Sequence, residues 1–173
     1  SCYHSGVRNP IDNAILACQT MPGRVAHFQE LLAEHKKIDE IPFDYTRKYV
    51  STLTADNSKG CQIIMKGDIA HVLARCSHVE YRGEIFPIEK DSLRSAASVV
   101  DEMLQDGMKV IAVARKSIPP KDRLLPSDEE KMILMGYLAF FDAPKKTAKA
   151  SVAALTRLQV IPKILTGDQA DVA

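Results

Sequence analysis

Short β-type runs joined by tight turns are the feature that most constrains the fold of this 173-residue sequence. The stretch EIPFDYTRKYVSTLT, residues 40–54, shows the pattern. Its second half is rich in Tyr, Val and Thr, which suit a pleated, half-buried strand. Its middle crowds two aromatic rings and two cations into six residues behind a proline, which is typical of a turn. We therefore predict two strands, residues 37–43 and 48–54, joined by a loop at residues 44–47.

Other segments alternate between strand-like and helix-like patterns. Asn9 can cap a helix, Pro10 suits its first position, and Asp12 lies in the first turn, where the helix dipole favours an acid. Gly107 is placed to end a later amphipathic helix. The predicted helices are residues 9–19, 24–37, 68–76 and 92–106, and the predicted strands are residues 61–66, a hairpin at 79–88 around Arg82-Gly83, and 109–116.

The pattern changes after residue 118. PPKDRLLPSDEEK, residues 119–131, is rich in proline and charge and predicts a linker or mobile loop. The apolar run MILMGYLAFF, a helix at residues 147–158 and the run VIPKILTGD then form a strand–helix–strand pattern, and such apolar strands are typical of parallel sheets. We therefore predict an α/β fold of α+β type. A mainly antiparallel sheet with helices on one face occupies residues 1–131, and a partial βαβ unit occupies residues 132–173.

Composition excludes several classes of function. The formal net charge is +1, so the chain lacks the broad positive field of a nucleic-acid binder. No apolar run approaches the roughly 20 residues of a membrane-spanning helix, and we expect a soluble piece. The four cysteines show no CxxC pair and are expected to be reduced. His71, Cys76 and His78 lie close in sequence, but at a predicted helix and its frayed end, so we predict no metal site there.

The turn after Pro42 suggests a binding site. If Phe43 and Lys48 close the hairpin, they become cross-strand neighbours on one face, and the next hairpin brings Lys66 within about one position of Lys48. Two neighbouring lysines repel unless an anion lies between them. Gly67 and a helix start follow Lys66, and backbone N–H groups there can receive a phosphate.

An aromatic platform, two ammonium groups and a helix start together suit a nucleotide. Adenine would stack on Phe43, Asp12 could accept a hydrogen bond from its exocyclic amine, and Lys109 could add a third cation. The structural alternative is that Phe43 belongs to the core, Asp12 only complements a helix dipole, and the lysines are solvated. These residues alone leave both interpretations open.

Six sequence blocks occur in a fixed order: NPIDNAIL, IPFDYTRKYVS, MKGD, GMKVIAVA, FFDAPKKT and ILTGD. Together they resemble the nucleotide-binding domain of a P-type cation-transporting ATPase. The pairing of SGVRNPIDNAIL with DEIPFDYTRK most resembles the magnesium-importing branch of bacterial pumps. Neither GxxxxGK[ST] nor GxGxxG occurs, so the resemblance is not to a phosphate-wrapping loop.

The resemblance implies roles for individual residues. Phe43 would stack on adenine and Asp12 would contact its edge, while lysines line the route of the phosphates. Lys109 stands where many relatives carry an arginine, so it keeps the charge but loses the bidentate fork. The resemblance thus assigns nucleotide binding to Asp12, Phe43, Lys48, Lys66, Gly67 and Lys109.

Two later motifs resemble parts of the phosphorylation domain. Residues Asp142 to Lys145 resemble the DPP[RK] hinge, with Ala143 in place of a proline that would stiffen it. Thr166, Gly167 and Asp168 resemble the TGD motif, which helps to organise the phosphorylated site of an intact pump.

The resemblance implies a cytoplasmic ATP-binding domain of a bacterial inner-membrane Mg²⁺ pump. Its ligands are ATP or ADP, with Mg²⁺ in the intact pump, and its partners are the phosphorylation and actuator domains and the transmembrane helices. We expect DKTGT before Ser1 and GDGxND beyond Ala173, so these residues alone would bind ATP without hydrolysing it. The C-terminal unit could also self-associate. The alternatives are a domain of a proton or calcium pump, or a non-enzymatic module that binds a polyanion or an acidic protein.

Overall fold

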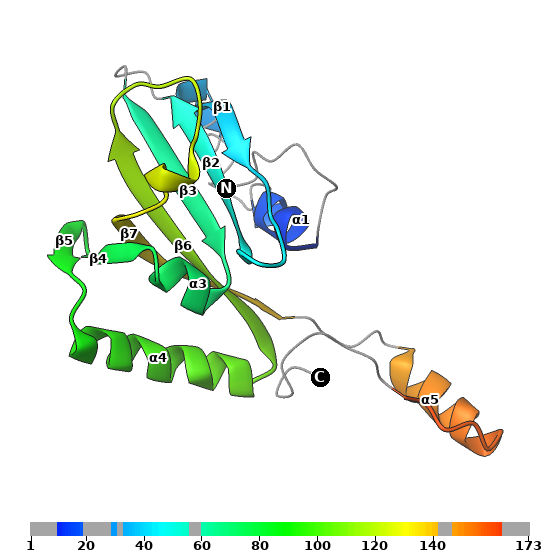
Figure 1. The fold of residues 1–173 in the computed structure, drawn as a ribbon. Coiled ribbons are helices and arrows are strands. Elements are labelled where there is room, and N and C mark those ends of the chain that lie inside the picture. The colour runs from blue at the N-terminus through cyan, green and yellow to red at the C-terminus, as the bar shows by residue number, and fades with distance from the viewer. Residues whose placement is uncertain (1–9, 19–28, 31–32, 56–59, 142–146, 164–173) are drawn as a thin grey trace.

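The structure is a mixed α/β fold built on one seven-stranded sheet, as Figure 1 shows. It is a computed structural model that describes residues 10–18, 29–30, 33–55, 60–141 and 147–163, without the side chains of residues 90–96. The strand order is β1-β2-β3-β6-β7-β4-β5, and all pairs are antiparallel except β4 with β7. The predicted class, a mainly antiparallel sheet flanked by helices, is confirmed.

The elements follow the predicted order closely in the first two thirds of the chain. The strands are β1 (Lys36–Ile41), β2 (Tyr49–Ala55), β3 (Cys61–Gly67), β4 (Cys76–Tyr81), β5 (Glu84–Pro87), β6 (Met108–Ile118) and β7 (Met132–Phe141). The helices are α1 (Pro10–Ala17), α3 (Ile69–Leu73), α4 (Lys90–Gln105) and α5 (Ala148–Arg157), with a 3₁₀ turn η2 at Pro126–Asp128. None of the helices in the described ranges is long and apolar enough to cross a membrane.

Local turn and cap chemistry explains several of these boundaries. Arg82 and Gly83 both have positive φ, 53° and 85°, which is the geometry of a two-residue hairpin turn. Gly107 has φ 75°, and its N–H donates to the carbonyl of Leu104, so it ends α4 as the sequence predicted. Asp68 caps α3 by accepting a hydrogen bond from the N–H of His71.

The core lies on one face of the central strands. Buried there are Leu53 from β2, Ile63 and Met65 from β3, and Val72 from α3, each 0% exposed. The opposite face of β3 carries Lys66, because successive residues of a strand point to opposite faces. Lys66 binds Asp12 of α1, so α1 and α3 lie on different faces of the sheet. The prediction that helices cover only one face is therefore wrong.

The segment at residues 119–131 is not the linker that its composition predicted. Leu124 is 4% exposed and Glu129 is 1% exposed, and the N–H of Leu124 donates to the carboxylate of Asp39 at 2.8 Å. Lys121 forms an ion pair with Asp128 at 2.5 Å. The segment is an ordered connection between two strands of one sheet. Proline and charge predict a break in regular structure, and here the break is an irregular connection within one sheet.

Strand β7 also belongs to that sheet and not to a second unit. It pairs with β6 in antiparallel fashion and with β4 in parallel fashion, which makes it a central strand. The apolar run therefore did indicate a strand with a parallel neighbour, but that neighbour is β4. The predicted βαβ unit starting at residue 132 is wrong in its first strand. Of its predicted second strand, residues 160–163 are not strand and the rest lies outside the described residues.

Several predicted helix ends differ by a few residues. Lys36 and Lys37 belong to β1, although the preceding helix was predicted to reach residue 37, and most of that helix lies outside the described residues. Helix α3 ends at Leu73, so Cys76 and His78 lie in β4 and not at a frayed helix end. Strand β4 takes these residues because they pair with β5 and β7.

Candidate functional site

The predicted site residues gather at one end of the sheet. Strand β2 begins there, β3 ends there, and the register pairs Tyr49 with Gly67. Gly67 lies opposite Ala112 of β6, so Lys109, three residues earlier, extends beyond the end of β3. Phe140 of β7 faces Lys109, so the end of β7 lies at this end too. The end of the sheet that carries the candidate residues is thus the end from which the chain leaves the sheet.

Lys66 and Asp12 form a buried ion pair at this end. Lys66 is 7% exposed and Asp12 is 2% exposed, and Nζ of the lysine donates to Oδ1 of the aspartate. A buried charge is stable only when it is paired and hydrogen-bonded. Asp12 therefore does more than complement the dipole of α1: it holds α1 against the face of β3 that carries Lys66.

Gly67 is required by a close approach of two backbones. A Cβ at this position would lie 2.4 Å from the carbonyl oxygen of Lys48 and 2.5 Å from Cα of Tyr49. The same carbonyl accepts a hydrogen bond from the N–H of Asp68 at 2.9 Å. The glycine thus lets the start of α3 sit directly against the end of the turn that carries Lys48.

The turn between β1 and β2 is longer than predicted. The last register pair is Ile41 with Ser51, so Phe43 and Lys48 are not cross-strand neighbours, and that prediction is wrong. Asp44 organises the turn instead, because its Oδ1 accepts hydrogen bonds from the N–H groups of Thr46 and Arg47 at 2.8 Å each. Such side-chain-capped turns compete with strand pairing.

Two exposed groups project from this turn. Phe43 is 52% exposed, and its ring meets that of Tyr45 edge to face at 5.6 Å. Lys48 is exposed and has φ 57°, an unusual conformation for a residue with a side chain. The exposure of Phe43 contradicts the structural alternative that it belongs to the core.

The two lysines are offset by one residue more than predicted. Lys66 lies opposite Val50, two positions from Lys48, where the sequence predicted about one. Their environments also differ, since Lys66 is buried beside Asp12 whereas Lys48 is in solvent. The two ammonium groups are therefore not an equivalent repelling pair.

Asp68 is a part of the site that the sequence analysis missed. Its Oδ1 lies 2.6 Å from Nδ1 of His71 and also caps α3. Partial burial alone would raise the pKa of Asp68, but the hydrogen bonds from His71 and the charges of His71 and Lys48 lower it below the ordinary value. The signal was present in the sequence, since an aspartate followed three residues later by a histidine at a helix start fits a capping aspartate.

A second missed cluster joins the turn to the segment at residues 119–131. Nη2 of Arg47 donates to Oε1 of Glu129, and the hydroxyl of Tyr49 donates to Oε2 at 3.4 Å. The guanidinium of Arg47 also lies over the ring of Tyr49, 4.4 Å from its centroid. Burial lowers the pKa of Arg47, but the Tyr49 hydroxyl and the Glu129 carboxylate outweigh it and raise the pKa. Of the two cations in the turn, Arg47 is therefore held by the protein and Lys48 is exposed.

The remaining predicted site residues cannot be placed. Asp142 and Lys145, and the motif Thr166, Gly167 and Asp168, lie outside the described residues. Within the described ranges no group of three metal-ligating side chains occurs, and His71, Cys76 and His78 form none. Burial raises the pKa of the Cys76 thiol to about 11, and its Sγ donates to the carbonyl of Val72.

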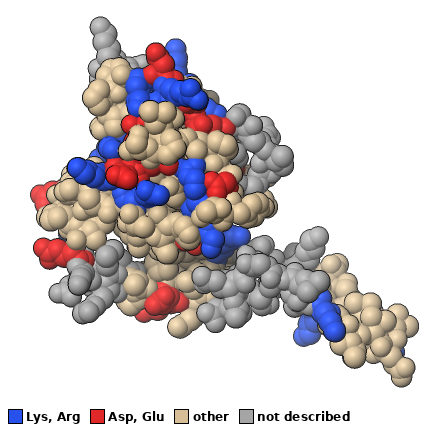
Figure 2. Space-filling view, in the orientation of Figure 1, with Lys and Arg blue, Asp and Glu red and all other residues tan. Residues whose placement is uncertain are grey.

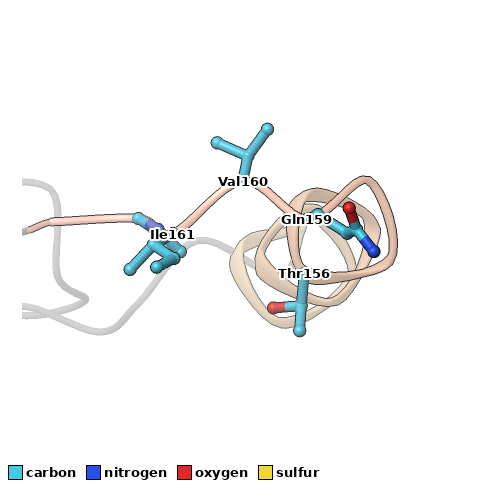
Figure 3. A pocket seen from close by; sticks show the side chains of 5 residues that line it. Thr156, Gln159, Val160 and Ile161 are labelled. Atoms are coloured by element: carbon cyan, nitrogen blue, oxygen red, sulfur yellow. The ribbon is translucent and has the colours of Figure 1, made fainter.

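Two other surface features carry no comparable chemistry. A shallow hollow at the end of α5 is lined by Thr156, Gln159, Val160, Ile161 and Pro162, and Figure 3 shows these side chains around the end of the helix. None of these lining residues is charged. Figure 2 shows acidic and basic side chains side by side on the face it displays, without a broad area of one sign. The local cluster at the end of the sheet is therefore the better candidate for binding an anion.

Comparison with known proteins shows the family to which the fold belongs. The family described as "P-type ATPase, cytoplasmic domain N" matches residues 5–147. The chain is 37% identical over its full length to a protein named "Magnesium-transporting ATPase, P-type 1" from Escherichia coli K12, of which the alignment covers 19%. It is 36% identical, again over its full length, to the protein of that name from Salmonella typhimurium LT2, also covering 19% of it.

More distant pumps match as well. A sodium/potassium-transporting ATPase subunit alpha from Hydra vulgaris is 30% identical over 83% of this chain and 15% of its own length. The chain spans about a fifth of the length of the magnesium-transporting relatives. The family match covers the whole seven-stranded sheet, from before α1 to beyond β7. This chain belongs to the cytoplasmic N-domain family of the P-type ATPases.

Proposed function

We propose that this chain is the ATP-binding domain of a P-type ATPase that transports Mg²⁺. The domain binds the adenine of ATP at the end of the sheet and presents the terminal phosphate to an aspartate in another part of the pump. The phosphorylation and actuator domains and the transmembrane helices of that pump are its partners. The DKTGT motif of the phosphorylated aspartate does not occur in these residues, so they bind ATP or ADP without hydrolysing ATP.

The observation that carries this proposal is the exposed ring of Phe43 on a turn anchored beside Lys48 and Gly67. An aromatic ring half in solvent, at 52% exposure, contributes little to the core and offers a face for a base. The carbonyl of Lys48 receives the N–H of Asp68, which ties this turn to the end of β3. Base stacking and a nearby cation are the two elements that recognition of a nucleotide needs.

The Lys66–Asp12 pair gives this site a polar wall. The pair carries a carboxylate and an ammonium on the face of β3 next to α1. An adenine edge offers both a donor and acceptors, so the two groups complement it without adding net charge. Lys48 and Lys109, both exposed, are then the cations that meet the phosphates. In the intact pump, Mg²⁺ accompanies the phosphates of ATP.

We further propose that the N-domain extends through β7 and that the chain leaves it at Asp142. Asp142 and Lys145 then form the hinge, and Thr166, Gly167 and Asp168 belong to the phosphorylation domain. The central place of β7 in the sheet supports this boundary over one at residue 131.

Isothermal titration with ATP, AMP and tripolyphosphate tests the proposal. ATP and AMP should both bind with saturation, and Phe43→Ala should weaken both by about 1–3 kcal/mol, the scale of a lost base stack. The matched control is Tyr81→Ala, another exposed aromatic at 62% exposure on β4, which should leave binding unchanged. If tripolyphosphate binds as tightly as ATP and Phe43→Ala has no effect, the site is a polyanion site and the proposal fails.

A test of the Lys66–Asp12 ion pair requires a variant in which both residues are replaced. Lys66→Ala breaks a buried ion pair by removing its ammonium group and should cost about 3–5 kcal/mol of folding free energy, so this single variant mixes folding with binding. The double variant Lys66→Met with Asp12→Asn removes both charges together. It should fold, and it should weaken ATP binding by about 1–3 kcal/mol through the loss of charge-assisted hydrogen bonds. Wild-type affinity in this double variant would exclude the pair from the site.

A further inference from the structure

Glu129 is a buried carboxylate that joins the segment at residues 119–131 to the turn before β2. It is 1% exposed and lies directly after the turn η2, in a segment that is otherwise mostly at the surface. Burying a carboxylate is unfavourable unless its oxygens are occupied. Both carboxylate oxygens of Glu129 accept a hydrogen bond, Oε1 from Nη2 of Arg47 and Oε2 from the hydroxyl of Tyr49.

The segment that carries Glu129 is held firmly. Lys121 pairs with Asp128 at 2.5 Å, and the same Asp128 carboxylate accepts from the N–H of Leu125 at 2.9 Å. Nζ of Lys116 donates to the carbonyls of Asp128 and Glu130, at 2.9 and 2.7 Å, on either side of Glu129. Glu129 is therefore a fixed point to which another part of the protein can be attached.

The part attached to it is the turn that bears Phe43 and Lys48. Arg47 directly precedes Lys48, and its guanidinium lies between Glu129 and the ring of Tyr49. The far end of the turn is tied at Lys48, whose N–H donates to the carbonyl of Asp44 at 2.8 Å and whose φ is 57°. A strained residue keeps its conformation only when its surroundings determine it. The backbone bonds of Lys48 with Asp44 and Asp68 supply part of that restraint, and the bond from the neighbouring Arg47 to Glu129 adds to it.

The same geometry places the bond on the face of the sheet away from Lys66. Tyr49 pairs with Gly67 and Val50 pairs with Lys66, so Tyr49 and Lys66 point to opposite faces. Arg47 covers the ring of Tyr49 and thus lies on the core face, with the fully buried carboxylate of Glu129. Glu129 and Arg47 therefore support the nucleotide site from behind without lining it.

We propose that Glu129 is a positioning residue: through Arg47 it fixes the turn that presents Phe43 and Lys48 to the nucleotide. This inference rests on the proposed function for its ligand. It predicts that loss of the Glu129 charge loosens the turn and weakens ATP binding, although Glu129 itself does not touch ATP.

Two readouts test it. The first is amide hydrogen exchange of Lys48, which needs no ligand: Glu129→Gln should speed this exchange at least about tenfold, because the turn opens more often. The second is ATP affinity, which should fall about tenfold in Glu129→Gln because the turn no longer holds Phe43 and Lys48 in a fixed position. The matched control is Glu80→Gln, which breaks the 2.7 Å ion pair with Arg115 elsewhere on the sheet and should change neither readout.

Coupling to Phe43 separates positioning from a general loss of stability. In a Phe43→Ala background, Glu129→Gln should weaken ATP binding by about threefold or less instead of tenfold, because the ring is gone and only Lys48 remains to be positioned. If the two losses simply multiply, or if Glu129→Gln binds ATP like the wild type, the proposal is overturned. All variants are compared at a temperature at which circular dichroism shows that each of them is folded.

The milder variant Arg47→Lys covers the case in which Glu129→Gln does not fold. It keeps the charge but loses the planar fork and the stacking on Tyr49, and it should weaken ATP binding about threefold and speed exchange at Lys48. Unchanged values for both would refute the inference. If the wild-type chain does not bind ATP, the proposed function fails, while the exchange of Lys48 still decides whether Glu129 holds the turn.

Discussion

At the scale of single residues, Gly67 is needed for packing between two strands, whereas its place in the sequence indicated phosphate binding. The sequence placed it before a helix start, where bare N–H groups can receive a phosphate. In the structure, its lack of a side chain is needed because the backbone of Lys48 and Tyr49 passes within 2.5 Å of where a Cβ would lie. That approach joins β2 to β3 and could not be predicted locally, since the contacting residues lie almost twenty positions away in the sequence.

Replacing Gly67 by alanine tests this close approach. Gly67→Ala should lower the free energy of unfolding by about 3 kcal/mol, because backbone must move to admit the Cβ. Gly107→Ala is the control: φ is 75° there and no atom lies within 4 Å of the added Cβ, so only about 1 kcal/mol of conformational strain is expected. Urea denaturation measures both, and equal losses would contradict the steric explanation.

Asp68 predicts a dependence of stability on pH. Its pKa is lowered in the folded state, so its ionised form stabilises the fold above the unfolded-state pKa of about 4, and this contribution is lost as pH falls through the lower folded pKa. Asp68→Asn keeps a good helix cap and removes only the charge. Because the side chain is 38% exposed, the loss should be below about 1 kcal/mol near pH 6, shrinking toward zero below pH 3. A difference from the wild type that is the same at both pH values would exclude the charge of Asp68 as its cause.

At the scale of elements, the local patterns predicted the strands, the helices and the pairing of strands that follow each other in a hairpin, whereas the pairing of β7 with strands distant in sequence was not predicted. The hairpin at Arg82-Gly83 and the end of α4 at Gly107 follow from turn chemistry within a few residues. The place of β7 depends instead on β4 and β6, which are distant in sequence. An apolar run predicts a buried strand but does not say which strand lies beside it. That ambiguity produced the predicted second unit.

The segment at residues 119–131 offers an element-scale test with adjacent residues. Leu124 is 4% exposed and packs in the core, whereas Leu125 is 45% exposed. Leu124→Ala should lower the free energy of unfolding by about 2–4 kcal/mol, and Leu125→Ala by less than about 0.5 kcal/mol. Urea denaturation compares them. A linker would tolerate both changes, so a small loss for Leu124→Ala would contradict the ordered connection.

At the scale of the whole molecule, one sheet brings distant motifs to one end. The predicted hairpins and the family resemblance placed Asp12, Phe43, Lys48, Lys66 and Lys109 in the same site, and the structure locates the last three at or near the end of the sheet. The structure also shows two ion pairs that the spacing of residues did not predict, Lys66 with Asp12 and Arg47 with Glu129. Side-chain pairing of this kind depends on the packed fold and has no signal in the spacing of residues.

The extent of the domain is a further prediction at this scale. A chain ending at Phe141 should unfold cooperatively, because it keeps every strand of the sheet. A chain ending at Lys131 should not, since the loss of β7 separates the β4–β5 hairpin from β6. Circular dichroism during thermal unfolding distinguishes the two. Cooperative unfolding of the shorter chain would contradict the boundary after β7.

The central claim is that ATP binds at the end of the sheet marked by Phe43, Lys48 and Lys66. An NMR titration of the ¹⁵N-labelled chain with ATP tests it most directly. We predict saturable shifts of the backbone amides of these residues, with no comparable shifts in the β4–β5 hairpin, and saturation only at higher ATP concentration in Phe43→Ala. An absence of saturable shifts with ATP, or shifts centred on the β4–β5 hairpin, would contradict the claim.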